Sequence, residues 1–348
     1  MWQEILSNYT LRVVLMGTML LGAVAGTIGV FLTLRKQALV GDALSHAALP
    51  GIVLAYIITQ ESSLYMSILG AIFASIFSIM LIEGIKRFSI IKNDAILAII
   101  LSSMFGFGQV LLSVIRDTAG QDQARLKSFI FGQAATMSLE DVLFLTAILA
   151  IVFLTVIVFW RHIKLFIFNK DFYHSLGFSS HLINVILNTL TILVVVSGIQ
   201  SVGVILMSAL LIAPAVAARL WSNNLKINVL LAAIFGAISG LLGTLFGTNV
   251  PTGPVIVIFA TSIVIVSLLV APRKGIVWVF ISERIHRSQI KEFKTLIHIH
   301  ENDSFDGVPL ESLRHLTNDG YLKKEAANYE LTFKGREKVL SILAGELR

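Results

Sequence analysis

Apolar residues form long runs without a formal charge through most of the chain. Runs that lack Asp, Glu, Lys and Arg span 13–34, 43–60, 62–82, 95–115, 142–160, 182–218 and 227–272. A helix that crosses a bilayer needs about 20 mainly apolar residues, so five runs fit one helix each and the last two are long enough for two. The pattern therefore predicts nine spanning helices, or eight if one short segment re-enters the membrane.

Turn-forming residues mark where the two longest runs divide. The sequence reads "SGIQSVG" at 197–203 and "GTNVPTG" at 247–253. Gly, Asn and Pro interrupt helices, so each site predicts the end of one helix and the start of the next. Segment 116–137 is more polar than its neighbours. Its sequence is compatible with a long outer loop and with a partly re-entrant segment.

Composition supports a protein embedded in a lipid bilayer. The 348 residues are 56% hydrophobic and 14% charged, whereas soluble domains carry about 25% charged residues. Cysteine is absent, which excludes disulfides and thiolate metal sites. Lys and Arg gather in alternate loops, at 35–36, 86–92, 161–170, 219–226 and 273–274. The positive-inside rule predicts that these loops face the cytosol.

The composition changes after Pro272. Residues 273–348 contain 13 Lys or Arg and 11 Asp or Glu, which is half of the charged residues. We therefore expect a transmembrane domain at 1–272 and a cytosolic domain at 273–348. The expected fold class is an all-α polytopic membrane protein with a small α+β tail.

The tail pattern predicts a helix at 290–302, a second helix opening at Pro309 and closing at Gly320, a hairpin, and a final helix. This order, with "GYLKKEAANYELTFKG" as the wing, resembles a winged-helix domain. Winged helices commonly bind DNA. The excess of only two positive charges and the membrane tether argue against nucleic acid as a partner. A regulatory or docking role is the preferred interpretation.

The segment "GDALSHAALPG" at 41–51 places ionisable groups inside an apolar run. Asp42 is the only formal charge between Lys36 and Glu61, and His46 follows four residues later. Residues at i and i+4 share a helix face, so both side chains can touch one ion. A charged group in the membrane costs roughly 3 kcal/mol on insertion scales, so it is expected to face a cavity, a partner or an ion. Oxygen and imidazole nitrogen suit Mn²⁺, Zn²⁺ or Fe²⁺ better than Cu⁺.

A structural interpretation of the same pair is equally consistent with these residues. Asp42 would then be solvated near the inner interface, and His46 would be a buried hydrogen-bonding residue. Two ligands also cannot complete a coordination sphere. Any further ligands must come from elsewhere in the chain or from a second copy.

Three longer segments resemble the membrane permeases of manganese/zinc/iron ABC importers. They are "LVGDALSHAALPGIVLA" (39–55), "VGVILMSALLIAPAVAARL" (202–220) and "VPTGPVIVIFA" (250–260), with weaker similarity in "KNDAILAIILSSMFGFG" (92–108) and "LKSFIFGQ" (126–133). The resemblance implies a permease homodimer or pseudo-dimer in the cell membrane, cytosolic ATPase subunits and an extracytoplasmic metal-binding protein. It also implies that Asp42 and His46 are the intramembrane metal ligands. The metal is then cargo, with no bound cofactor and no catalytic residue.

The same resemblance covers a loop at the predicted cytosolic side. "KDFYHSLGFSS" (170–180) is similar to the segment by which ABC permeases dock on their ATPases. By this similarity, the ATPase-coupling residues are Asp171, Phe172, Tyr173, Leu176 and Gly177, with the apolar side chains offered to a partner groove. A plain amphipathic connector at the interface is the alternative.

The sequence lacks the common ATP-binding and zinc-protease motifs, as expected for a chain that takes its energy from a partner. The sequence contains no G-x-x-x-x-G-K-[ST] phosphate loop and no H-E-x-x-H zinc-protease motif. We therefore expect ATP-driven alternating access with hydrolysis in separate subunits. A secondary metal-ion transporter would usually need further intramembrane acids beyond Asp42. A membrane-anchored metal-responsive regulator is the remaining alternative, and the sequence does not choose among manganese, zinc and iron.

Overall fold

The computed structural model describes residues 9–60, 63–115, 132, 137–247, 251–272, 275–280, 296–300, 308–325 and 328–343. The chain divides into two compact units, Met1–Pro272 and Arg273–Arg348. The sequence left two alternatives for segment 116–137, a long outer loop and a partly re-entrant segment. Most of this segment lies outside the described residues. So does most of the helix predicted at 290–302, of which residues 296–300 are helical.

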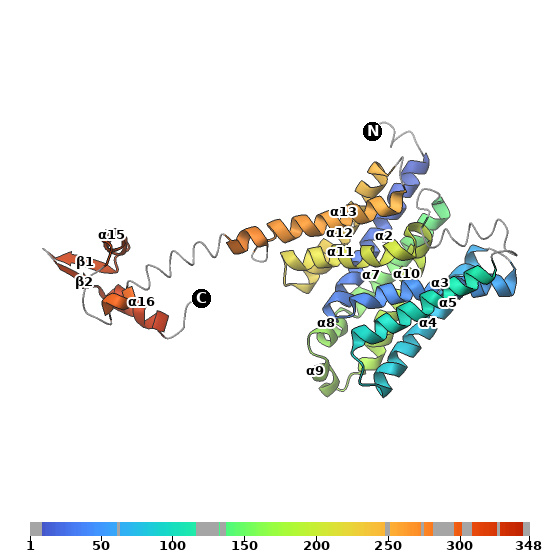
Figure 1. Cartoon of the computed structure of the whole chain (residues 1–348), viewed down its shortest axis with the longest axis horizontal. Coiled ribbons are helices and arrows are strands. Elements are labelled where there is room, and N and C mark those ends of the chain that lie inside the picture. The colour runs from blue at the N-terminus through green and yellow to red at the C-terminus, as the bar shows by residue number, and fades with distance from the viewer. Residues whose placement is uncertain are drawn as a thin grey trace. The chain divides into compact units, whose positions relative to one another are not determined.

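The first unit is a bundle of long apolar helices (Figure 1). Within the described residues, eight helices are long and apolar enough to cross a membrane. They are α2 (Tyr9–Leu34), α3 (Ala38–Thr59), α4 (Leu64–Phe88), α5 (Asn93–Val114), α7 (Leu139–Val158), α10 (Ser180–Val202), α12 (Leu225–Phe246) and α13 (Thr252–Val270). The prediction of a polytopic helical membrane protein is therefore confirmed.

Helix α11 (Val204–Trp221) is a ninth apolar helix, shorter than the others. Its 18 residues rise about 27 Å, close to the roughly 30 Å of a bilayer's hydrocarbon core. The seven uncharged runs thus contain nine helices among the described residues, as predicted, and eight of these helices have full spanning length. The break before α11 falls at Gly203, whose φ of 91° is a conformation that glycine adopts without steric cost.

Two short helices connect α7 to α10. Helix α8 covers Trp160–Phe168 and helix α9 covers Lys170–Ser175. Asn169 separates them because its extended backbone ends α8 while its side chain caps α9. The Phe172 backbone N–H donates to Asn169 Oδ1 at 2.9 Å. Asparagine is among the best residues for this cap, so the sequence specifies the start of α9.

Close backbone contact joins α2 to α12. A Cβ atom on Gly22 would overlap the carbonyl oxygen of Gly236, and a Cβ atom on Gly236 would overlap that of Gly22. Nearby, Thr18 Oγ1 lies 2.8 Å from Thr244 Oγ1, so the two hydroxyls hydrogen-bond between the helices. Lipid tails give no hydrophobic drive for helix association, so small residues and interhelical hydrogen bonds hold such contacts.

The second unit contains a hairpin between two helices. Its elements are α15 (Leu310–Asn318), β1 (Leu322–Glu325), β2 (Asn328–Leu331) and α16 (Phe333–Leu343). The strands are antiparallel, with Leu322 opposite Leu331. The buried apolar cluster comprises Leu296, Ile299, Leu313, Leu316, Leu322 and Val339.

Sequence signals located these tail elements. Pro309 immediately precedes α15, and Gly320 follows it with a positive φ of 77°. Thr332 then ties the hairpin to α16, because its hydroxyl donates to the Gly320 carbonyl at 2.7 Å and accepts from the Gly335 N–H at 3.1 Å. The assignment of this unit as a winged helix stays a prediction.

The α2–α12 contact gives a stability prediction. We expect Gly22→Ala to destabilise the protein by about 1–3 kcal/mol, because the added methyl group forces the two backbones apart. Gly84→Ala in α4 is the matched control, since a Cβ there meets nothing within 4 Å. The control should be neutral or more stable, because alanine favours helix. Thermal unfolding of the full chain in detergent measures both, and equal midpoints would contradict the prediction.

Candidate metal site and coupling segment

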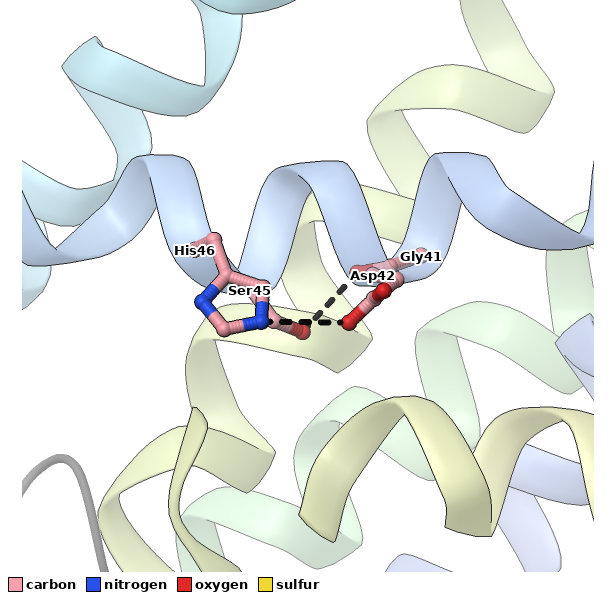
Figure 2. Close-up of polar contacts among 4 residues, drawn as sticks. All are labelled: Gly41, Asp42, Ser45 and His46. Atoms are coloured by element: carbon pink, nitrogen blue, oxygen red, sulfur yellow. Dashed lines mark hydrogen bonds and ion pairs between the residues drawn. The ribbon is translucent and has the colours of Figure 1, made fainter. Parts of the chain in front are cut away.

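Helix α3 carries both members of the candidate metal pair. Asp42 and His46 project from the same side of the helix, as Figure 2 shows, and His46 Nε2 lies 3.3 Å from Asp42 Oδ1. The side chains are 26% exposed for Asp42 and 15% for His46, so neither is fully enclosed by protein. The expected i, i+4 juxtaposition is therefore present in the structure.

The separation of these two atoms fits ligands of a single ion. Zinc binds nitrogen and oxygen ligands at about 2.0–2.2 Å, and a tetrahedral angle then sets the ligand atoms about 3.3–3.5 Å apart. Among the described residues, no group of three or more His, Cys, Asp or Glu side chains is placed to hold a metal. The pair is thus a partial site, and further ligands would have to come from other groups.

Side chains from neighbouring helices complete the surroundings of the pair. The His46 ring meets the Phe105 ring of α5 edge-on, with centroids 4.8 Å apart. The Ser208 hydroxyl of α11 hydrogen-bonds the Asp42 carboxylate. His46 Nδ1 is buried and has no hydrogen-bond partner within the described part of the chain. A buried imidazole nitrogen without a hydrogen-bond partner lowers the stability of the fold unless a ligand or a water molecule bonds to it.

Proline and glycine shape the backbone around the pair. Pro50 lies inside α3 and has no N–H, so the carbonyl group of His46, four residues earlier, loses its usual helical donor. Gly108 of α5 packs against this proline, because a Cβ on Gly108 would lie 2.9 Å from Pro50 Cδ. On the other side, a Cβ on Gly41 would lie 2.8 Å from Leu211 Cδ1 of α11. These small residues let α5 and α11 approach closely on both sides of the pair.

Sequence reasoning did not single out Ser208 or Phe105. Both lie inside segments quoted for their resemblance, Ser208 in 202–220 and Phe105 in 92–108. The signal that pointed to them was therefore the similarity of whole segments and not their residue type. The structure brings these segments together around α3.

The predicted coupling segment corresponds to α9 and the residues after it. Phe172 is 50% exposed and Leu176 is 48% exposed, so both present apolar surface as expected. Asp171 is also exposed, and Gly177 ends the segment with a positive φ of 82°. The expectation that Tyr173 is offered to a partner is wrong, because this side chain is only 3% exposed.

Tyr173 instead anchors α9 to its surroundings. Its hydroxyl lies 3.3 Å from His162 Nδ1, and its ring stacks on Phe178 with centroids 5.3 Å apart. The Phe166 ring of α8 contacts it edge-on at 5.9 Å. Burial raises the pKa of the Tyr173 phenol above its usual range. Tyr173 is therefore a packing residue that orients the exposed Phe172 and Leu176.

The chain is similar to known transport proteins. It matches the family model described as "ABC 3 transport family" over residues 7–271. It is 42% identical over 278 residues to the zinc transport system membrane protein TroC of Treponema pallidum (strain Nichols), which covers 79% of this chain and 93% of that protein. It is 41% identical over 266 residues to the manganese transport system membrane protein MntC of Bacillus subtilis (strain 168), which covers 76% of this chain and 61% of that protein.

A solved structure has the same architecture. The similarity to a chain of "PsaBC from Streptococcus pneumoniae in complex with Fab" has a TM-score of 0.69 at 32% identity, and covers 78% of this chain and 95% of that chain. The membrane-length helices and these relatives together indicate a multi-pass protein of the cell membrane. Since the family model spans the whole apolar unit up to Ala271, this chain belongs to the ABC 3 transport family.

Proposed function

We propose that this chain is the transmembrane permease subunit of an ATP-driven importer of divalent transition-metal ions. The observation that carries the proposal is the Asp42–His46 pair, 3.3 Å apart on a membrane-length apolar helix. Relatives named as zinc and manganese transport system membrane proteins support the substrate class. The proposed cargo is Zn²⁺ or Mn²⁺, with Fe²⁺ also compatible with an oxygen and nitrogen ligand set.

The incomplete ligand set suits transport better than storage. A transported ion must be bound well enough to enter and weakly enough to leave. Two protein ligands leave the remaining positions for water or for the same pair in a second copy of the chain. A homodimer, or a related second permease chain, would provide that copy. An extracytoplasmic metal-binding protein would deliver the ion, and alternating access would pass it inward.

Energy would come from separate cytosolic ATPase subunits. We assign α9 and the residue after it as the segment that contacts them, because Phe172 on this short capped helix and Leu176 at its C-terminal cap are exposed apolar side chains. Asp171 and Gly177 flank this surface, and Tyr173 holds it from beneath. An amphipathic segment that places such residues in a partner groove is a common recognition mode.

The second unit is proposed as a cytosolic winged-helix-like module with a regulatory or docking role. Its helix–hairpin–helix order supports this proposal. Contact with the ATPases or with the same unit of a second copy fits its nearly balanced charge better than DNA binding does.

Substitution of the pair tests the metal site. We expect Asp42→Asn and His46→Ala each to lower metal uptake by about tenfold or more, because each removes one of two ligands from the ion. Uptake of zinc and of manganese would be measured in metal-starved cells that also carry the ATPase and the binding protein, at matched membrane levels. Asp94→Asn and His315→Ala are matched controls, because both side chains are exposed and lie outside the pair. Normal uptake by the two site variants would overturn the assignment.

Substitution on α9 tests the coupling surface. We expect the double variant Phe172→Ala/Leu176→Ala to weaken ATPase binding by about tenfold or more, because exposed aromatic and apolar anchors often dominate an interface. Co-purification of the ATPase with the full-length permease, and uptake in the same cells, provide the measurement. Phe107→Ala, at a 49% exposed position of α5, is the control for loss of an apolar side chain. If ATPase recovery is unchanged in the double variant, α9 is not the coupling segment.

A further inference from the structure

A basic cavity lies where the α2–α3 turn, the end of α4 and the start of α10 meet. Its volume is about 600 Å³, within the range of pockets that hold small ligands. Five cationic side chains and a single carboxylate line it among the described residues: Arg35, Lys36, Lys86, Arg87, Lys170 and Glu83. This excess of positive charge makes the cavity unsuited to a metal cation and favourable for an anion.

The one carboxylate in the cavity is already engaged. Glu83 Oε1 accepts a hydrogen bond from Asn184 Nδ2 at 2.7 Å. The Arg35 guanidinium donates to the side-chain oxygen of Asn184 and, at 3.5 Å, to that of Asn188. Burial lowers the pKa of Arg35 to about 10, against an opposing effect of Glu83, so this group still carries its charge at pH 7. Lys36, Lys86, Arg87 and Lys170 have exposed side chains, and the part of the chain described gives none of them a salt bridge to a carboxylate.

Backbone and hydroxyl groups add further donors to the same cavity. Helices α3 and α10 begin at its wall, after Gln37 and Ser179, and neither start has a side-chain cap. Uncapped N–H groups and the positive end of the helix dipole favour an anion. Ser180 also lines the cavity, and its buried hydroxyl has no hydrogen-bond partner in the described structure. The cavity therefore holds unused donors of three kinds.

The position of the cavity favours a lipid as the source of the anion. It lies at the ends of spanning helices, where bilayer headgroups are found, on the side that the positive-inside rule assigns to the cytosol. Exposed apolar side chains lie close to its cations in the chain. Phe88, which is 86% exposed, follows Arg87, and Phe168, which is 60% exposed, lies two residues before Lys170. Basic pockets between helices on this face are suited to anionic headgroups, with acyl chains against the adjoining apolar surface.

We propose that this cavity binds the phosphate group of an anionic phospholipid headgroup. The cations that line it come from the turn before α3, the end of α4 and the start of α9. A bound phosphate would therefore bridge the helix that carries Asp42 and the segment that begins with Lys170. This site is separate from the Asp42–His46 pair and does not depend on the transported ion.

Native mass spectrometry of the full-length chain in detergent tests the proposal. The protein would be titrated with dioleoyl-phosphatidylglycerol, with dioleoyl-phosphatidylcholine as the neutral reference. The variant Lys86→Gln/Arg87→Gln should weaken phosphatidylglycerol binding by about 30-fold, from roughly fivefold for each charge removed beside an anionic headgroup. Arg161→Gln/Lys164→Gln is the matched control, because both residues are exposed on neighbouring α8 and do not line the cavity. The control should bind as the parent chain does.

Further experiments distinguish a loss of binding from a folding defect, and a lipid phosphate from a soluble phosphate. The variant Lys86→Arg/Arg87→Lys keeps both charges and should bind phosphatidylglycerol as the parent chain does. If Lys86→Gln/Arg87→Gln is not monodisperse, Lys86→Gln alone is used in its place, and its affinity for phosphatidylglycerol should fall about fivefold. If millimolar inorganic phosphate does not displace phosphatidylglycerol, the result supports a lipid as the source of the phosphate. Displacement by phosphate supports the phosphate site but assigns it to a soluble anion.

Two results would overturn the proposal. The first is equal loss of phosphatidylglycerol binding in the cavity variant and in the control variant, or no loss in either. The second is unchanged lipid binding together with loss of ATPase co-purification in the cavity variant, which would assign the cavity to a carboxylate of a protein partner.

Discussion

The Asp42 carboxylate lies on a helix of membrane length, and the bilayer offers it no hydrogen-bond donors. In lipid, each backbone polar group must be satisfied within the protein, which dictates helices. Each ionisable side chain must also find a partner, water or an ion. His46 and Ser208 supply such partners here, and glycines let α5 and α11 pack closely against α3 beside the pair. The cost of the charge thus accounts for the partners that surround Asp42, and it is the physical basis of the proposed metal site.

Two regions of the apolar unit favour ions of opposite charge. The pair on α3 combines a carboxylate with an imidazole, and these oxygen and nitrogen ligands favour a metal cation. The cavity at the end of the same helix is lined mainly by Lys and Arg, which favours a phosphate. Arg35 stands only seven residues before Asp42 in the chain. The start of α3 is therefore the place where the proposed metal site and the proposed phosphate site adjoin.

Much of the fold follows from the order of apolar and charged residues, because a spanning helix leaves a long uncharged run. The positions of all nine apolar helices, the Gly203 break and the Pro309 and Gly320 limits of α15 were predictable for this reason. The juxtaposition of Asp42 with His46 was predictable from helical period alone. The contact with Ser208 was not, because tertiary packing places α11 beside α3. The burial of Tyr173 was missed because a six-residue helix carries too short a pattern to show which face packs inward.

The central claim is that one metal ion binds both Asp42 and His46. Zinc K-edge X-ray absorption of the purified, zinc-loaded full-length chain tests it directly. The account predicts a nitrogen and oxygen shell at about 2.0–2.2 Å with outer-shell scattering from an imidazole ring. In the His46→Ala variant that outer-shell scattering should disappear. An unchanged imidazole signal in this variant, or no zinc retained by the parent chain, would contradict the account.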